Sequence, residues 1–464
     1  MTCRRYSLAL FAVTACASDV SLGGPNTLVR VDTEANGVNC PGGGLAINTG
    51  LDADGDTFLD DTEITSTQFV CNGNTKVQCS GGTILQGTID VRNAGDFAQL
   101  AGVNCIDGDL LIAGTEVDEF PLADLATITG DLVISGNSEL ESLDGLRSLR
   151  EVGRRVHLQV NAALADVGAL GSLRRCDEIA IVGNDALTDL VGLEEFVNIT
   201  STITISSNAS LRSLAGLDNL TTSSRSIVIR GNRSLVSLAA LDNLRSVGTL
   251  DILGNDALLE FSFANLEKVD GRLVVSANAS LATAKLPVVS TIGEFLRFES
   301  DPSLISISTP ELLTTGALFV NDNTSLTTLD VPSLVFATAS IELANLPRVT
   351  DLRFGTLTSI GTSLVILAAP TLSGLGGFAS LGSIGGDLQL DTTNLTNFTG
   401  LGALEVVSGD MRITNNGQLQ SFAGLSALDE VGGDLMISGN ASLPGSNAQS
   451  FANGITVRGT VTIN

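Results

Sequence analysis

A polar residue that recurs every 22 to 24 residues is the feature that most constrains the fold of this chain. Each recurrence follows an alternating apolar segment such as "DLVISGN" and precedes a leucine by three residues. Alternation indicates a strand with one buried and one exposed face. Because so short a unit cannot bury its own apolar edge, successive units must stack as coils. The recurring positions are Asn137, Asn161, Asn184, Asn208, Asn232, Asn255, Asn278, Asp301, Asn323, Asn416 and Asn440.

The repeat predicts a mainly β fold, a right-handed parallel β-helix or leucine-rich-repeat-like solenoid of about fifteen coils of 22–24 residues, with parallel strands about 4.8 Å apart. At a tight corner the asparagine amide can bond the backbone of the next coil, so we expect the asparagines to form a ladder. Leu346, Ala369 and Thr393 interrupt the series. Prolines collect nearby, and we expect these coils to be less regular. The prolines are Pro302, Pro310, Pro332, Pro347 and Pro370.

The first residues read as an export signal. Arg4 and Arg5 precede a short apolar run that ends near Val13, too short to span a bilayer. The following "VTAC" resembles the lipobox of bacterial lipoproteins. This resemblance implies that 1–15 are removed, that Cys16 carries lipid, and that the protein is anchored to the outer membrane at the cell surface. The alternative is an ordinary signal peptide with an incidental cysteine. Residues 16–36 then read as a tether.

Five cysteines remain beyond Cys16, and pairing is expected in an exported protein. Proximity favours disulfides between Cys40 and Cys71 and between Cys79 and Cys105, although sequence alone does not prove connectivity. Cys176 is left as a buried free thiol.

Residues 37–75 form a predicted acidic module that contains "DADGDTFLDDTE", which starts at Asp52. Its spacing resembles the EF-hand calcium loop, in which alternating oxygen donors wrap one Ca²⁺ ion. Thr57 departs from this pattern, since the family has glycine at the sixth position, and the flanks are not long helices. The alternative is an acidic, solvated turn. The expected ligands are Asp52, Asp54, Asp56, Phe58 through its carbonyl, Asp60 and Glu63.

The segment "CSGGTILQGTIDVRNAGDFAQLAGVNCIDGDLLI", from Cys79 to Ile112, resembles the opening of receptor L domains. The resemblance extends over 76–464, although the repeat is longer than a typical L domain. It implies a disulfide between Cys79 and Cys105 and a broad sheet face that binds another macromolecule, a protein or a glycan.

Charge and composition exclude several other functions. A formal net charge of −27 argues against a nucleic-acid partner, and contact with the membrane is expected only through the lipid. The single histidine, His157, excludes multi-histidine zinc sites and is placed on the outward face of a strand. Asp251 and Arg297 are the residues closest to a polysaccharide-lyase acid–base pair, but two coils separate them by roughly 10 Å. We therefore expect no enzymatic activity.

Three functions remain: surface recognition or adhesion, a structural envelope spacer, and, least favoured, a polysaccharide-active enzyme. The outward residues in the middle of each strand contain only two acids among fourteen. We therefore place partner binding on this face, at Val274 and Phe319, although β-propensity alone also enriches valine in strands. This outward column is Val133, His157, Ala180, Thr204, Val228, Asp251, Val274, Arg297, Phe319, Glu342, Val365, Gln389, Arg412 and Met436.

Overall fold

The computed structural model describes residues 27–34, 44–51, 59–60, 63–71 and 77–464. The chain divides into two compact units, Met1–Lys76 and Val77–Asn464. Each unit is described by itself below.

The first unit contains a three-stranded antiparallel sheet in the order β1-β2-β3. Its strands are β1 (Thr27–Glu34), β2 (Gly44–Leu51) and β3 (Ile64–Cys71). The prediction of a tether over 16–36 is therefore wrong for 27–34, because this segment pairs along its whole length with β2. The alternating sequence "TLVRVDTE" suits a strand, but its proximity to the export signal hid this.

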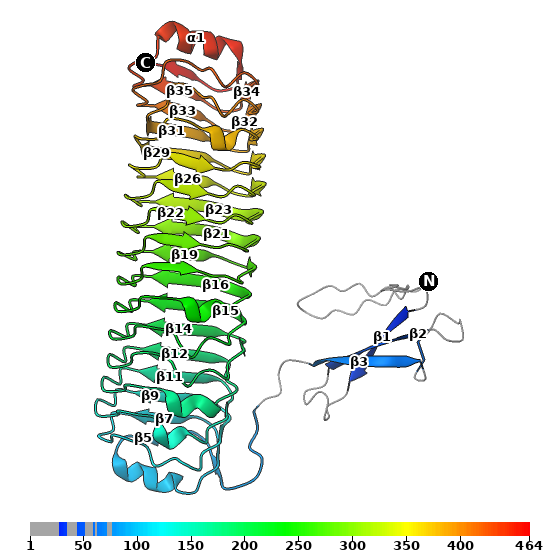
Figure 1. The fold of residues 1–464 in the computed structure, drawn as a ribbon, viewed down its shortest axis with the longest axis vertical. Coiled ribbons are helices and arrows are strands. Elements are labelled where there is room, and N and C mark those ends of the chain that lie inside the picture. Colours follow the sequence, from blue (N-terminus) through cyan, green and yellow to red (C-terminus); the bar gives the residue numbers. More distant parts are fainter. Residues whose placement is uncertain (1–26, 35–43, 52–58, 61–62, 72–76) are drawn as a thin grey trace. The chain divides into compact units, whose positions relative to one another are not determined.

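The second unit is a parallel β-solenoid of about 17 turns, which confirms the predicted fold class (Figure 1). The count exceeds the predicted fifteen because coils lie before the first asparagine of the repeat and one lies after the last. Its main sheet stacks one strand from each coil in parallel. These strands are β5 (Ile89–Val91), β7 (Leu110–Ala113), β9 (Leu132–Ser135), β11 (Arg155–Gln159), β12 (Glu178–Val182), β14 (Thr202–Ser206), β15 (Thr222–Arg230), β16 (Ser246–Leu253), β19 (Leu273–Ser276), β21 (Thr291–Glu299), β23 (Thr314–Asn321), β26 (Ile341–Ala344), β29 (Leu364–Ala369), β31 (Leu388–Thr393), β33 (Met411–Thr414), β35 (Leu435–Ser438) and β37 (Val461–Ile463).

A second sheet of short parallel strands precedes the main sheet in nearly every coil, and the coil of β12 contributes only a single bridge at Arg175. The long strands β15, β16, β21 and β23 run through both sheets. The remaining strands of this second sheet are β4 (Ile84–Gln86), β6 (Cys105–Asp107), β8 (Thr127–Ile128), β10 (Glu151–Val152), β13 (Asn198–Ile199), β18 (Lys268–Val269), β25 (Phe336–Ala337), β28 (Ser359–Ile360), β30 (Ser383–Ile384), β32 (Val406–Val407), β34 (Glu430–Val431) and β36 (Thr456–Val457).

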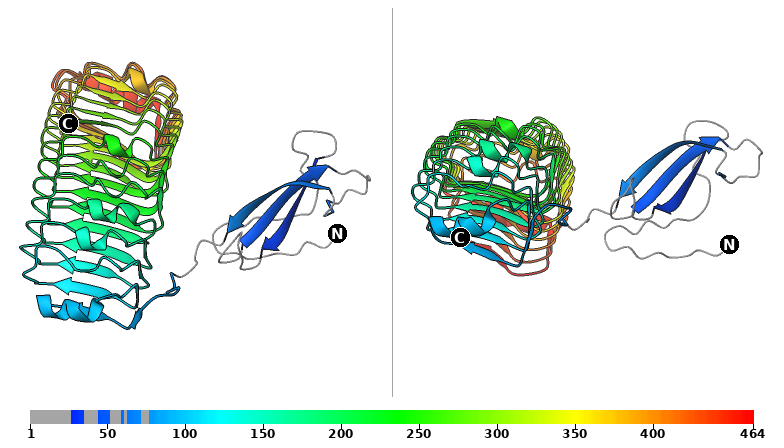
Figure 2. Two further views of the ribbon diagram at one scale, coloured as in Figure 1. Left: turned by 60° about the horizontal axis from the view of Figure 1, so that its bottom comes forward. Right: turned by 90° about the horizontal axis from the view of Figure 1, so that it is seen from below.

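The third side of the coils varies along the stack, as the views in Figure 2 show. In the middle it is a five-stranded parallel sheet, whereas other coils have 3₁₀ turns there. The strands are β17 (Glu260–Ser262), β20 (Thr283–Lys285), β22 (Ser306–Ser308), β24 (Thr328–Asp330) and β27 (Asp351–Arg353). The 3₁₀ helices of the unit are η1 (Ala94–Leu100), η2 (Asp144–Leu146), η3 (Gly168–Ser172), η4 (Ala239–Leu241) and η5 (Gly376–Phe378).

Inward leucine, isoleucine and valine side chains fill the narrow interior, and nearly all of them are fully buried. Helix α1 (Gly445–Gly454) closes the C-terminal end of the stack (Figure 1). Its Phe451 stacks on Phe422 at 4.0 Å between ring centroids, and Phe422 stacks on Phe398 at 5.4 Å. Among the residues that the structure describes, no helix is both long and apolar enough to cross a membrane.

The predicted asparagine ladder is present. At a typical position, Asn208 Oδ1 accepts the backbone N–H of Asn184 at 2.9 Å, and Asn208 Nδ2 donates to the Ile181 carbonyl at 2.9 Å. The same pattern links neighbouring coils from Asn137 to Asn278, and a threonine starts the series, since Thr115 donates through both N–H and Oγ1 to Asn137 Oδ1. Each buried corner N–H therefore finds an acceptor in the next coil.

The predicted irregularity near Leu346 is confined to the ladder. Strands β26, β29 and β31 pair in parallel through this segment, and the Leu346 N–H donates to the backbone carbonyl of Ala368 at 3.1 Å instead of to a side chain. Thr393 starts a second ladder, because its N–H and Oγ1 both donate to Asn416 Oδ1. Between Asn323 and Asn416, ladder side chains are therefore absent only at Leu346 and Ala369.

A second kind of ladder, which the sequence analysis missed, lies at the start of the main-sheet strands. Here an aspartate Oδ1 accepts the backbone N–H of the equivalent residue in the next coil. The acceptors are Asp109, Asp131, Asp387, Asp410 and Asp434, and the corresponding distances are 2.8, 3.2, 2.8, 2.7 and 2.7 Å. The sequence signal was the Gly-Asp pair before each of these strands, written "GDL" at four positions and "GDM" at Asp410.

Candidate functional site

The outward face of the main sheet is the candidate site. Most of the column residues named above are half-buried by their neighbours on adjacent strands, and Met436 is the most open at 38% exposure. Ala180 and Asp251 are buried, at 6% each, although they lie in the predicted outward column. Strands about 4.8 Å apart shield the side chains between them.

An aromatic–cation cluster, formed by Phe295, Arg297 and Phe319, lies near the middle of this face. Phe295 and Arg297 are two residues apart on β21 and therefore point to the same side. The register of β21 and β23 pairs Arg297 with Phe319. The guanidinium carbon of Arg297 lies 5.2 Å from the ring centroid of Phe295 and 4.7 Å from that of Phe319. The two rings meet edge to face, with centroids 5.8 Å apart.

Arg297 is only partly satisfied by its surroundings. Its Nε is buried and has no hydrogen-bond partner among the described residues, and its terminal nitrogen lies 3.6 Å from a carboxylate oxygen of Glu299. The side chain keeps 36% exposure. The two phenyl rings thus hold the guanidinium in place while one part of it still faces solvent.

The two predicted binding residues lie on either side of Arg297. Val274 pairs with Arg297 across β19 and β21, and Phe319 pairs with it on the other side. Arg297 belongs to the predicted outward column but was not named as a binding residue, and Phe295 was not predicted to lie on this face. The alternating "FLRF" at 295–298 could have indicated that Phe295 lies on the same face as Arg297. A register shift between Ile292 and Phe295 makes it difficult to tell from spacing alone which face Phe295 lies on.

The residues considered for catalysis each have structural partners. Arg272 binds Asp251 through two contacts of 3.1 and 2.8 Å, and Arg297 belongs to the aromatic–cation cluster. His157 Nε2 lies 2.9 Å from Glu178 Oε1 and is half-buried on the outward side of β11. In the described ranges there is no group of three or more His, Cys, Asp or Glu side chains placed to hold a metal ion.

The structure contains the predicted disulfide between Cys79 and Cys105, with the two Cα atoms 5.7 Å apart. Cys176 is a buried free thiol, as predicted, and burial raises its pKa. Cys16 and Cys40 lie outside the described residues. For Cys71 only the backbone, at the end of β3, is described, so the Cys40–Cys71 disulfide stays a prediction.

Of the predicted calcium ligands, Asp52, Asp54, Asp56 and Phe58 lie outside the described residues. Asp60 and Glu63 form a turn in which the Asp60 N–H donates to Glu63 Oε2 at 3.2 Å and the Glu63 N–H donates to the Asp60 carbonyl at 3.2 Å. Gly50 pairs with Ile64 across β2 and β3, so the two ends of the acidic segment are held next to each other. This arrangement is compatible with a loop that closes around an ion.

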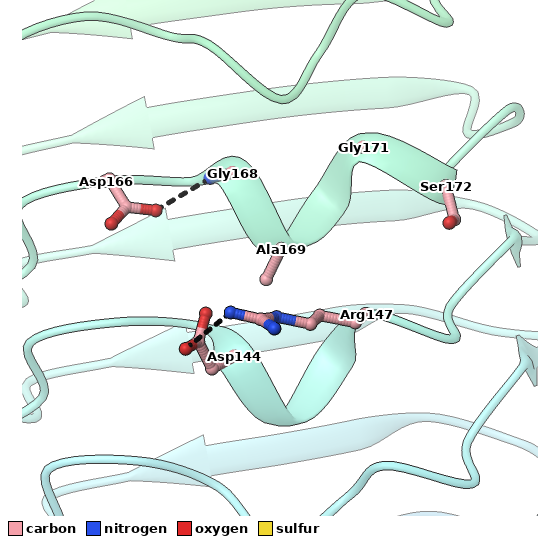
Figure 3. Close-up of a pocket in the computed structure, with 7 residues that line it drawn as sticks. All are labelled: Asp144, Arg147, Asp166, Gly168, Ala169, Gly171 and Ser172. Carbon is pink, nitrogen blue, oxygen red and sulfur yellow. Dashed lines mark hydrogen bonds and ion pairs between the residues drawn. The ribbon is translucent and has the colours of Figure 1, made fainter.

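An open depression of ≈ 470 Å³ lies between the turns η2 and η3, and Figure 3 shows its residues. Arg147 forms an ion pair with Asp144 at 2.7 Å, and Asp166 Oδ1 accepts the Gly168 N–H at 2.9 Å. Since these charged groups are bound within the wall itself, the depression is a weaker candidate than the sheet face.

Comparisons with known proteins describe the two units separately. Residues 26–71, which include all three strands of the first unit, match a family described as "Domain of unknown function (DUF7151)". No curated protein matches the chain. The crystal structure of an internalin from Listeria monocytogenes is similar to 72% of this chain and 87% of that one, with 14% sequence identity and a TM-score of 0.25. This similarity is too low for conclusions about function.

Proposed function

We propose that this protein is a surface recognition or adhesion protein that binds a macromolecular partner, a protein or a glycan, on the outward face of the main sheet. The observation that carries the proposal is the aromatic–cation cluster of Phe295, Arg297 and Phe319. Aromatic residues and arginine are enriched at interfaces, because they combine large contact areas with directed polar groups.

The charge of the face supports the same function. The chain carries 51 acidic residues, yet only Asp251 and Glu342 of the fourteen column residues are acidic. Arg272 binds Asp251, and the Asn321 amide donates to Glu342 at 3.2 Å. The face around Val274 and Phe319 is thus less acidic than the chain as a whole, as expected of a docking surface.

Two sequence resemblances extend the proposal. The receptor L-domain resemblance implies macromolecular binding by the solenoid, and the Cys79–Cys105 disulfide supports this resemblance. The lipobox resemblance around Cys16 implies export and anchoring in the outer membrane. Incorporation of labelled palmitate into the wild type and not into Cys16→Ser would support the anchor, and equal labelling of both would contradict it.

The test of the function is a binding screen with the soluble chain from Ala17 onward against glycan and cell-surface protein arrays. The variant Val274→Glu with Phe319→Asp should bind the partner found at least tenfold more weakly, because it places charge in a mildly apolar contact. Val133→Glu is the matched control, since it changes the same residue type in the same column far from the cluster. Melting temperatures should match in all three proteins.

Other outcomes would support the alternative functions. A chain that binds nothing on either array, but whose deletion weakens the envelope, would be a structural spacer. Release of cleaved sugar products from a bound glycan would identify an enzyme.

We further propose that the acidic segment binds Ca²⁺ through Asp52, Asp54, Asp56, the Phe58 carbonyl, Asp60 and Glu63. The paired strand ends that bracket the segment support this, and the absence of glycine at position 57 weighs against tight binding. The expected affinity is about 10⁻⁴–10⁻³ M, as in other extracellular modules. Calorimetry should show one site that Asp54→Ala abolishes, and no heat at millimolar calcium would contradict the proposal. Any fragment used must include β1.

A further inference from the structure

Asp301 occupies a ladder position in which every neighbouring coil has an asparagine. Its Oδ1 accepts hydrogen bonds in the same way as the ladder asparagines, from the backbone N–H of Asn278 at 2.7 Å and from the Asn278 side-chain amide at 3.1 Å. Its own backbone N–H donates to Asn323 Oδ1 at 3.0 Å. The residue is fully buried.

The second oxygen of Asp301 breaks the pattern. Elsewhere the amide nitrogen of a ladder asparagine donates to a strand carbonyl of the preceding coil. Asn255 donates to Ile229, Asn278 to Ile252 and Asn323 to Phe298, at 3.0, 3.1 and 2.9 Å. The equivalent carbonyl for position 301 is that of Val275, because Ile252, Val275 and Phe298 lie in register on adjacent strands.

A carboxylate cannot make this bond. Asp301 Oδ2 is one of three buried side-chain atoms without a hydrogen-bond partner in the described part of the chain. The Val275 carbonyl correspondingly receives no ladder amide there. An ionised oxygen aimed at a carbonyl oxygen would be repelled, whereas a protonated one would donate the missing bond.

We propose that Asp301 is a neutral carboxylic acid whose Oδ2–H donates to the Val275 carbonyl, and that its ionisation weakens the stack at this coil, so that the solenoid has one pH-sensitive junction. Burial raises the pKa of Asp301 to about 7, while hydrogen bonds from Asn278 oppose this rise and the negative charge of Glu299 adds to it.

The other charged groups near this position are few. The ladder neighbours Asn278 and Asn323 are uncharged. Glu299, on β21, lies beside Arg297, and Asp322, next to Asn323, accepts the exposed Asn345 amide at 2.7 Å. Among the described residues, no cation is thus placed against Asp301 to stabilise its ionised form. Protonation therefore gives Oδ2 its hydrogen bond.

The direction of the pH effect follows from linkage. The folded state holds the proton up to about pH 7, whereas the unfolded state releases it near the ordinary aspartate pKa of 3.8. Stability from this group is therefore complete below about pH 4 and is lost as the pH rises to about 7. A difference of about three pKa units corresponds to a roughly thousand-fold change in the unfolding equilibrium constant.

The test compares unfolding of the wild type and Asp301→Asn from pH 4 to pH 8. Asparagine restores a permanent donor to Val275, so the variant should gain stability over the wild type as the pH rises. Asn255→Asp is the matched control, and it should acquire the same pH dependence at another coil. Infrared difference spectra of wild type and Asp301→Asn should show a protonated carboxyl at pH 5 that disappears by pH 8. A stability difference that does not change with pH, or no protonated carboxyl at pH 5, would overturn the proposal.

Discussion

Coils that carry a ladder side chain and coils that lack one, at Leu346 and Ala369, differ in how their buried corner N–H groups find a hydrogen-bond acceptor. From Thr115 to Asp301, corner N–H groups donate to side-chain oxygens of the next coil. At Leu346 the N–H donates to a backbone carbonyl, while the strands above and below remain paired. The comparison shows that the requirement is a partner for each buried N–H, and that asparagine is one way to supply it.

The opening coil of the solenoid is held to its neighbour in a third way, by a disulfide. It precedes the ladder and is joined by the Cys79–Cys105 disulfide. In a stack where each coil contacts only its neighbours, a terminal coil has one side without support and separates first. A covalent link at this end therefore stabilises the coil that has the fewest neighbours.

The largest expected effect comes from replacing a ladder asparagine with the residue of the unladdered coil. Asn208→Leu removes the acceptor of Asn184 and the donor to Ile181, all of them buried. We expect a loss of about 3–5 kcal/mol, because unpaired buried groups cost about 1–3 kcal/mol each. Denaturant unfolding measures it, with Ala209→Ser as the exposed neighbouring control. A cost below about 1 kcal/mol would mean that the corner rearranges to the backbone bond of Leu346.

The disulfide should have the next largest effect. Cys79→Ser with Cys105→Ser opens a loop of 26 residues and should cost about 3.5 kcal/mol in the chain-entropy model. Hydrogen exchange should rise in the first coils and remain unchanged beyond Asn208, because solenoid coils unfold locally. Uniform exchange along the stack would contradict this.

The smallest effect concerns the residue before each ladder position, which has a left-handed backbone conformation in every laddered coil. Glycine occupies some of these positions, including Gly183 at φ 67°, but valine occupies one, with Val160 at φ 54°. Because β-branched residues are strained there, Val160→Gly should stabilise the protein by about 0.5–1 kcal/mol. The reciprocal Gly183→Val should destabilise it. Equal melting temperatures would show that the corner relieves the strain.

Residue periodicity accounts for most of the fold and for part of the candidate site. The asparagine spacing predicted the coils, the ladder and the inward faces, because a stacked repeat places equivalent residues in equivalent environments. It did not reveal that β1 belongs to the first unit or that Phe295 lies beside Arg297 and Phe319. Strand partners, and the register shift before Phe295, depend on contacts between distant segments. The protonation of Asp301 likewise depends on which atoms surround it.

The central claim, that a partner docks on the aromatic–cation cluster, is tested most directly by site-specific photo-crosslinking. A benzophenone amino acid placed at Phe319 should crosslink the partner identified in the binding screen, and the same amino acid at Val133 should not. Competition with unlabelled wild-type chain should abolish the signal at Phe319. Efficient crosslinking at Val133 with none at Phe319, under conditions where the partner is bound, would contradict the claim and place the binding surface elsewhere.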